Sequence, residues 1–332
     1  MYYKDEVQRR NAEKLQNQLD KYKVPMFIRS YLFNKRSKLG SINYWCAIKD
    51  LLLWLIEKNM INKNSISEII PEDMKYIEAG TINTYFEEKE MDGISPTTLY
   101  TRKNIFRSFW EAMVDSPNVP VTCNVIKNVA YEGLDSNCTR YVKMPKESEI
   151  KEMEENIKKK NDDFVRERNL IILTILKETG LRECELSELE FSSLFLDGSK
   201  EEKEESPFIK VMGKGVYRIE KARNVLLSGT AKRAFLDWLE IRSKIENIVD
   251  EKAIFLNKNG KRLSEYNISS IFKTYSKGKI TPHMMRHWYL SEATQKYGAT
   301  FAQQQAGHKS SSITVNTYID GGFGIREKLA QS

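Results

Sequence analysis

The sequence predicts a mainly α-helical fold that carries a small antiparallel β-sheet (α+β), and three observations lead to this expectation. Apolar residues recur with the spacing of amphipathic or buried helices in residues 41–58 and 166–180. Two short apolar segments, FIKV and NVLL, flank a turn with two glycines, as in a β-hairpin. Residues 130–146 follow neither period, so they are expected to link two domains.

The first half of the chain predicts a helical domain. Residues 4–34 are highly charged and amphipathic, and Pro25 divides them. Helices are also predicted over 41–58, 70–90 and 95–115, the last of which opens with a Ser-Pro start signal. The side chains expected in the core of this half are Trp45, Leu52, Leu53, Ile56, Phe106, Phe109, Trp110 and Met113.

The second half predicts a mostly helical domain around the hairpin. The hairpin is expected to pair FIKVMGKG with ARNVLLS. Gly180 follows an apolar helix directly, which is typical of a helix C-cap. The helices expected in this half are 146–160, 166–180, 230–245, 267–277 and 281–298.

Composition sets broad limits on the protein class. The 332 residues are 40% hydrophobic, which suits two globular domains, and the net charge of +7 suits a polyanionic partner without identifying one. The four cysteines show neither CxxC spacing nor a metal cluster, and the charged N-terminus lacks an apolar signal region. The longest apolar run, residues 51–56, is too short to span a membrane. We therefore expect a reduced cytoplasmic chain.

Polar residues that suit phosphate chemistry occur in the helix predicted over 281–298. Thr281 is its expected N-cap and Pro282 its first residue. His283 and Arg286 are three residues apart, so both project from one helix face. A guanidinium and an imidazole on one face can bind one phosphate group.

Three further residues extend this set. Arg182 in TGLRECEL would supply a second guanidinium, while His308 and Tyr318 lie in AGHKS and VNTYI. Each alone has an ordinary interpretation, such as a surface arginine after a helix C-cap or a packing tyrosine. Their conjunction in one chain favours a site that stabilises a phosphodiester under attack by a tyrosine.

The predicted helix 95–115 carries hydroxyl and cationic side chains in its first turns. The free N–H groups of a helix N-terminus favour anions, so this surface could contact DNA phosphates. An exposed polar helix face is the alternative interpretation. On this helix we expect Thr97, Thr98, Arg102 and Lys103 to contact DNA. We also expect contacts from Arg140 in the linker and Lys221 in the hairpin.

At these motifs the chain resembles the tyrosine site-specific recombinases, or phage-type integrases, which include Cre, lambda integrase and the Xer proteins. The matching strings are TGLRECEL, VMGKG, HMMRH, AGHKS and VNTYI. The resemblance extends over residues 144–319 and more loosely over 41–131. It implies an N-terminal SAM-like helical core-binding domain and a tyrosine-recombinase catalytic domain. The catalytic residues that it implies are Arg182, Lys214, His283, Arg286, His308 and Tyr318.

Glu185 follows the first arginine at the position of an acidic residue in the family. The resemblance implies that its carboxylate orients neighbouring groups, whereas a solvated helix residue is the alternative. Two lysines are candidates for the catalytic lysine, because the segment after Gly215 is four residues longer than in the family pattern. We favour Lys214, at the hairpin tip between two glycines, over Lys221; a third interpretation has both lysines merely contacting phosphates.

The resemblance also implies a mechanism without metal, cofactor or ATP. Tyr318 attacks a phosphodiester to form a 3′-phosphotyrosine, and the two arginines neutralise the developing charge. Lys214 protonates the leaving 5′-oxygen and His283 acts as base toward the tyrosine, while His308 donates a hydrogen bond to the phosphate. The sequence has no carboxylate cluster of the two-metal nuclease kind.

The expected domains are a charged helical extension (1–40), a core-binding domain (41–131), a linker (132–146), a catalytic domain (147–318) and a C-terminal tail (319–332). The resemblance implies a homotetramer on double-stranded DNA recombination sites in the nucleoid, with or without a paralogous recombinase or accessory protein. Two other functions stay open, a type IB-like DNA topoisomerase and a catalytically silent DNA-binding protein on the same fold.

Overall fold

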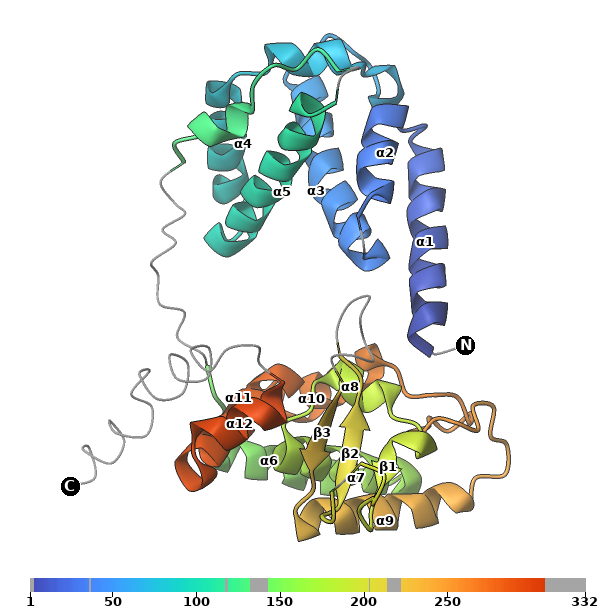
Figure 1. Ribbon diagram of the computed structural model, residues 1–332. Coiled ribbons are helices and arrows are strands. Elements are labelled where there is room, and N and C mark those ends of the chain that lie inside the picture. The colour runs from blue at the N-terminus through green and yellow to red at the C-terminus, as the bar shows by residue number, and fades with distance from the viewer. Residues whose placement is uncertain are drawn as a thin grey trace, which may run out of the picture. The chain divides into compact units, whose positions relative to one another are not determined.

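The computed structural model describes residues 3–35, 37–116, 119–131, 143–202, 204–213 and 222–307. The chain divides into two compact units, Met1–Thr139 and Arg140–Ser332 (Figure 1). Its described residues are mainly helical, and they include a three-stranded antiparallel sheet in the second unit. The predicted fold class is therefore confirmed.

The N-terminal unit is built from helices whose ends follow the start and stop signals of the sequence. Helix α1 ends at Lys21 and α2 begins after Pro25, so the predicted break is confirmed. The side chain of Ser95 caps α5 and Pro96 is its first residue. The α-helices of this unit are α1 (Tyr3–Lys21), α2 (Met26–Phe33), α3 (Lys38–Glu57), α4 (Ala79–Met91) and α5 (Pro96–Val114), with short 3₁₀ turns η1 (Ile66–Glu68), η2 (Pro71–Tyr76) and η3 (Val125–Asn128).

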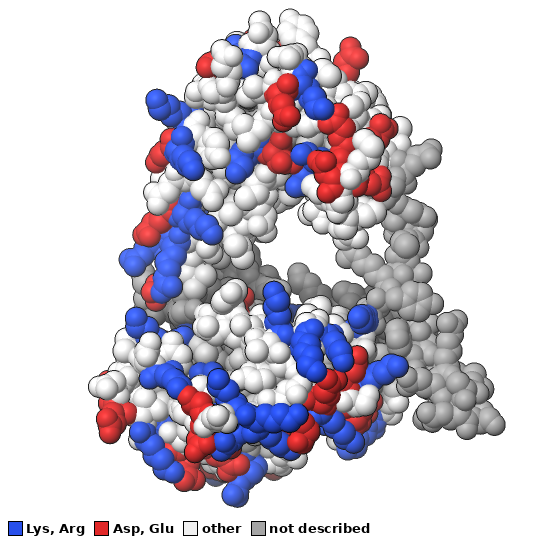
Figure 2. Space-filling model, turned by 180° about the vertical axis from the view of Figure 1, so that it is seen from behind, with Lys and Arg blue, Asp and Glu red and all other residues white. Residues whose placement is uncertain are grey.

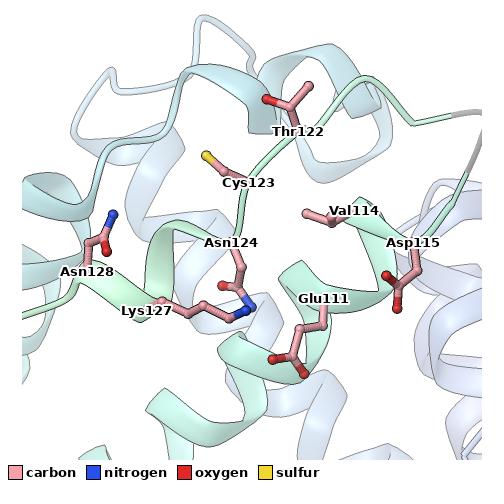
Figure 3. Close-up of a pocket in the computed structure, with 8 residues that line it drawn as sticks. All are labelled: Glu111, Val114, Asp115, Thr122, Cys123, Asn124, Lys127 and Asn128. Carbon is pink, nitrogen blue, oxygen red and sulfur yellow. The ribbon is translucent and has the colours of Figure 1, made fainter.

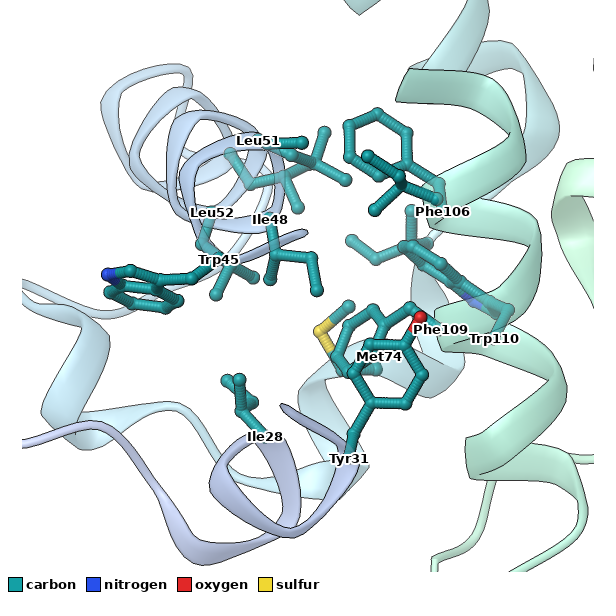
Figure 4. Packing of buried hydrophobic residues seen from close by; sticks show 14 of the residues in the cluster. Ile28, Tyr31, Trp45, Ile48, Leu51, Leu52, Met74, Phe106, Phe109 and Trp110 are labelled. Atoms are coloured by element: carbon teal, nitrogen blue, oxygen red, sulfur yellow. The ribbon is translucent and has the colours of Figure 1, made fainter. Parts of the chain in front are cut away.

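One hydrophobic core runs through this unit, and Figure 4 shows part of it between α2, α3 and α5. Trp45 and Leu52 are fully buried, as predicted, and so is the expected core face of α5. Leu15 and Leu19 of α1 are also fully buried in the same core. The described residues before 41 thus share one core with residues 41–131.

Two predictions for this unit were wrong in detail. Leu53 was expected inside, but it is 41% exposed because it lies about 100° around the helix from buried Leu52. The helix expected over 70–90 is two elements, η2 and α4. Ile77 and Glu78 between them have extended backbone, and the side chain of Ile77 is buried in the core.

Helix α3 is the one described helix whose length and composition would allow it to cross a membrane, and half of that stretch is buried inside the protein. Its buried side chains belong to the core of the N-terminal unit.

The C-terminal unit surrounds a small sheet with helices. Helix α7 ends at Gly180, whose left-handed backbone (φ 59°) makes it the predicted C-cap. The short helices α8 and α12 were not predicted, because neither has a long apolar period. The elements of this unit are α6 (Glu147–Lys158), α7 (Asp163–Thr179), α8 (Glu183–Glu188), η4 (Phe191–Ser193), β1 (Leu194–Phe195), β2 (Phe208–Val211), β3 (Arg223–Leu226), α9 (Gly229–Ser243), α10 (Glu265–Tyr275), α11 (Pro282–Tyr297) and α12 (Ala299–Ala306).

The sheet has the order β1-β2-β3. Strands β2 and β3 pair antiparallel with Val211 opposite Arg223, which confirms the predicted hairpin. Strand β1 is an addition of two residues, and Phe195 of this strand stacks on Phe208 with 4.5 Å between ring centroids. Val211 and Arg223 thus face each other where the two strands meet the segment that contains Lys214.

The remaining elements pack around α7. Its apolar side chains meet α9, α6 and α11, and Trp238 of α9 stacks on Phe255 at 5.3 Å. Helices α11 and α12 lie side by side through small residues such as Ala293 and Ala302, and α12 also contacts β3 (Figure 1). The C-terminal end of α7, the start of α11 and the end of α12 are thereby brought together.

The burial of α1 generates a test. Leu19→Ala removes a fully buried side chain from the shared core, so we expect it to lower the free energy of unfolding of the N-terminal unit by about 3 kcal/mol. Lys14→Ala, on an exposed position of the same helix, should leave that free energy near the wild-type value. Urea unfolding followed by tryptophan fluorescence measures both. Equal stability of the two variants would mean that α1 is a detachable extension.

Candidate active site

Arg182 is positioned by the tight turn that joins α7 to α8. Gly180 takes the left-handed conformation there, and a Cβ atom on it would lie 2.3 Å from the ring of Tyr289. Only glycine therefore fits between the turn and α11. Arg182 follows as the N-cap of α8, and its backbone N–H donates to Glu185 Oε2 at 2.9 Å.

Glu185 accepts bonds from two arginine side chains and lies near a third. Arg182 Nη1 donates to Oε1 at 2.6 Å. Arg223 binds both carboxylate oxygens, with Nη1 3.0 Å from Oε1 and Nη2 2.9 Å from Oε2. Arg286 Nη1 lies 3.9 Å from Oε2. Glu185 is only 6% exposed, so the alternative of a solvated helix residue is wrong.

The strength of this arrangement is reflected in the pKa of Glu185. Burial by itself raises the pKa of this carboxyl, because it disfavours the charged form. The hydrogen bonds and charge of Arg223, followed by the charges of Arg286 and Arg182, outweigh burial and hold the pKa at about 2. Glu185 is therefore ionised at any physiological pH.

Arg286 is held from both sides by backbone carbonyl groups. Its side chain is 2% exposed, with Nη1 donating to Gly180 O at 2.7 Å and Nη2 donating to Ala306 O at 2.6 Å. Arg286 thus fastens the turn before Arg182 to the last residue of α12. Thr281 caps α11 and Pro282 is its first residue, as predicted.

His283 lies at the exposed start of α11, one turn before Arg286. The ring of His287 packs edge-on against it, with the centroids 4.5 Å apart. His287 was not predicted as a site residue, although residues four apart on a helix, such as His283 and His287, are expected to be in contact. This contact limits the orientations that the His283 ring can adopt.

Several predicted residues lie outside the described part of the chain. Gly307, which precedes His308, is the last described residue of the C-terminal segment. The predicted site residues for which no position is described are Lys214, Lys221, His308, Tyr318 and Arg140.

Arg223 lies in the centre of the cluster but was not predicted as a site residue. Its Nε donates to Gln305 O at 2.8 Å in addition to the two bonds to Glu185. The one indication in the sequence was its position at the start of the predicted strand that follows Lys214 and Lys221. That position alone does not reveal which carboxylate the arginine meets, because Glu185 lies 38 residues earlier.

In the N-terminal unit, the predicted DNA-contacting residues divide into two kinds. Thr97 and Thr98 are exposed in the first turn of α5. Arg102 Nη1 instead pairs with Asp50 Oδ2 at 2.6 Å, and Lys103 Nζ donates to Val129 O at 2.8 Å. Both cations therefore bind groups of their own unit in this structure, Arg102 through Nη1 and Lys103 through one N–H of its ammonium.

A pocket in the same unit lies at the opposite end of α5 (Figure 3). Its wall carries the carboxylates of Glu111 and Asp115 beside Lys127 and the exposed thiol of Cys123. Two carboxylates make this pocket a poor phosphate site. Figure 2 likewise shows Lys and Arg mixed with Asp and Glu on one face of the molecule, so charge alone does not locate a DNA contact.

Among the residues that the structure describes, no group of three or more His, Cys, Asp or Glu side chains could hold a metal ion. Glu185 faces arginines and forms no part of such a group. The guanidinium groups of Arg182, Arg223 and Arg286 are themselves suited to binding an anion.

Comparison with known proteins agrees with this chemistry. Residues 144–323, more than half of the chain, match the Phage integrase family. The chain belongs to this family. A tyrosine recombinase XerC of Thermodesulfovibrio yellowstonii is 26% identical over 270 residues, which cover 77% of this chain and 81% of that protein. A tyrosine recombinase XerC of Vibrio vulnificus strain YJ016 is 24% identical over 74% of this chain and 73% of the relative.

Solved structures share the fold of this recombinase at low sequence identity. A lambda integrase dimer bound to a COC′ core site has a TM-score of 0.65 at 14% identity, covering 92% of this chain and 95% of that one. XerH bound to a palindromic difH substrate, in a post-cleavage complex, has a TM-score of 0.61 at 18% identity, covering 86% and 78%. The chain is thus a tyrosine recombinase, an enzyme of site-specific recombination.

The arginine cluster of the recombinase gives a stability prediction. Glu185→Gln leaves three buried or half-buried arginines without their shared anion, so we expect the free energy of unfolding to fall by about 3 kcal/mol at pH 7. The loss should be equal at pH 6 and pH 8, because both lie above the ordinary glutamate pKa. It should shrink only as the pH falls from about 4.5 toward the folded value of about 2.

Glu152→Gln is the matched control, since Glu152 pairs with exposed Lys277 and Lys279. Chemical unfolding of both variants across this pH range provides the comparison. If Glu185→Gln were as stable as Glu152→Gln, the cluster would not depend on the buried carboxylate.

Proposed function

We propose that this recombinase cuts and rejoins double-stranded DNA at specific sites through a 3′-phosphotyrosine bond formed by Tyr318. The observation that carries the proposal is the convergence of Arg182 and Arg286 on one buried carboxylate. Fixed guanidinium groups stabilise a phosphoryl group under attack, because they meet its developing negative charge without reorganisation.

The two arginines differ in how much of each guanidinium is available. Within the described residues, Arg182 uses Nη1 for Glu185 and is 21% exposed on its side chain. Its Nε and Nη2 can therefore bind a non-bridging phosphate oxygen. Arg286 is almost fully buried and donates to two backbone carbonyls, so its contribution is a fixed positive charge.

Proton transfer completes the proposed reaction. His283 accepts the proton of the Tyr318 hydroxyl as its oxygen attacks phosphorus, and the bond to the 5′-oxygen breaks. Lys214 protonates that leaving oxygen, while His308 donates a hydrogen bond to the phosphate. Attack by a 5′-hydroxyl of the partner duplex then releases Tyr318, so no metal, cofactor or ATP is consumed.

The proposed partner is a DNA duplex that carries a recombination site, bound in the cytoplasm at the nucleoid. Residues 41–131, with residues 1–40 packed on them, would bind the core site. Residues 132–146 would link this domain to residues 147–318, which would catalyse DNA cleavage and rejoining. The exposed Thr97 and Thr98 at the start of α5 support a phosphate contact there. Arg102, Lys103, Arg140 and Lys221 are the cationic contacts that we propose.

We also propose that four copies assemble on two DNA sites. The tail 319–332 would reach a neighbouring subunit, since its glycines at 321, 322 and 324 allow an extended path and its short REKLA segment offers little to bury on its own domain. A paralogous recombinase or an accessory protein could occupy positions in this assembly.

The nucleophile gives the direct test of this function. Tyr318→Phe should bind its DNA site as the wild type does and form no covalent adduct with a nicked suicide substrate, because the attacking oxygen is absent. Denaturing gel electrophoresis of labelled DNA detects the adduct. If the Phe variant formed an adduct, the nucleophile would be a residue other than Tyr318.

Metal independence is checked with the wild-type protein in the same assay. Excess chelator should leave the yield of adduct unchanged. Loss of cleavage in chelator would rule out the proposed charge stabilisation by arginines alone.

The two candidate lysines are separated by substitution. Lys214→Ala should slow cleavage by about a hundredfold or more, the usual effect of losing a general acid, whereas Lys221→Ala should slow it far less. A substrate with sulfur in place of the leaving 5′-oxygen needs no protonation, so it should restore the rate of Lys214→Ala selectively. Selective rescue of Lys221→Ala would assign the general acid to Lys221.

A further inference from the structure

Arg223 connects three elements that carry or adjoin predicted site residues. It is the first residue of β3, opposite Val211 of β2, and follows the segment that contains Lys214 in the sequence. Its two terminal nitrogens bind both oxygens of Glu185 on α8, at 3.0 and 2.9 Å. Its Nε donates to Gln305 O near the end of α12, at 2.8 Å.

The contact with α12 explains the glycine before His308. Gly307 has a left-handed backbone (φ 64°), and its N–H closes the helix on Gln303 O at 2.9 Å. A Cβ atom on Gly307 would lie 2.8 Å from Cδ of Arg223 and 3.1 Å from its Nε. The Arg223 side chain therefore lies flat against the one residue that separates α12 from His308.

Arg286 holds the same helix end, at the next carbonyl. Arg223 binds Gln305 O and Arg286 binds Ala306 O, so two guanidinium groups satisfy successive carbonyls that the helix leaves open. Both arginines also face Glu185. The end of α12 is thus fixed to the carboxylate that orients Arg182.

We propose that Arg223 is a positioning residue for DNA cleavage, which fixes the end of α12, the helix that precedes His308 in the sequence, against the Glu185–Arg182 pair. This inference rests on the proposed function of Tyr318. Arg223 needs no contact with DNA for this role, because all three of its bonding nitrogens meet protein acceptors.

Only arginine can make this connection. A guanidinium offers donors in a planar fork that matches a carboxylate, and its Nε points to a third acceptor. The ammonium of lysine keeps the charge but cannot span both carboxylate oxygens and Gln305 O in one plane. Arg223→Lys therefore separates geometry from charge.

The experiment compares Arg223→Lys with Arg242→Met. Arg242 is buried (7% exposed) and donates to Ala253 O and to Glu251 O, and among the described residues it has no contact with the arginine cluster. Three quantities are measured in each full-length variant: affinity for a DNA half-site, rate of covalent adduct formation on a suicide substrate, and amide hydrogen exchange.

We expect Arg223→Lys to bind the half-site as the wild type does and to form the adduct between about 10-fold and 100-fold more slowly, the effect of a small misplacement of reacting groups. Exchange should accelerate in the last turn of α12, residues 303–307, and remain unchanged in α9. Arg242→Met should show the wild-type adduct rate and unchanged exchange in α12.

A pH profile adds a signature that general destabilisation would not give. The charged groups that face Glu185 are Arg182, Arg223 and Arg286. In Arg223→Met, the loss of the principal partner raises the pKa of Glu185 above its wild-type value, so adduct formation should begin to fall at a higher pH than in wild type. Adding Glu185→Gln to this variant should remove the extra pH dependence.

The outcomes separate this inference from the proposed function. If the wild type forms no adduct, the role of Tyr318 fails, while exchange in α12 still tests the connection made by Arg223. If the wild type forms the adduct and Arg223→Lys matches it in rate and exchange, the positioning role is overturned. Faster exchange throughout α9 and α12 alike would also overturn it, because Arg223 would then support only general stability.

Discussion

The ion cluster around Glu185 is the constraint on which the site depends. A single carboxylate, 6% exposed, receives Arg182 from the turn after α7 and Arg223 from β3, and lies beside Arg286 from α11. Guanidinium groups gathered this closely would repel one another without an anion between them. Glu185 supplies that anion before any phosphate arrives, so the arginines are arranged in advance of binding.

The backbone of the C-terminal unit is shaped to this cluster. Gly180 permits the turn that precedes Arg182 and packs against the ring of Tyr289, and Gly307 leaves room for Arg223. The carbonyls of Gly180 and Ala306 accept the bonds that hold Arg286. Local conformation, packing and electrostatics therefore meet at one point, where α7, α11, α12 and the hairpin converge. Under the proposed function, a phosphate entering there would meet donors that need little rearrangement, which would favour a charged transition state.

Sequence patterns predicted the elements whose signals are local. The cap and first residue of α11, the break at Pro25, the Gly180 cap and the hairpin each depend on a few adjacent residues, and each is confirmed. The burial of α1 in the common core and the partner of Arg223 depend on contacts across many residues, which no local period encodes. The same limit applies to the pairing of Arg102 with Asp50, which lies 52 residues away in sequence.

The ionisation of Glu185 tests this account most directly. Carbon-13 labelling of the glutamate carboxyls, with Glu185→Gln to assign the resonance, allows a titration of the folded protein by NMR. The arrangement predicts that Glu185 is still ionised at pH 4, in line with a pKa of about 2. A resonance that is mostly protonated at pH 4, with a pKa near the ordinary 4.5, would contradict the claim that Glu185 holds the arginines of the site together.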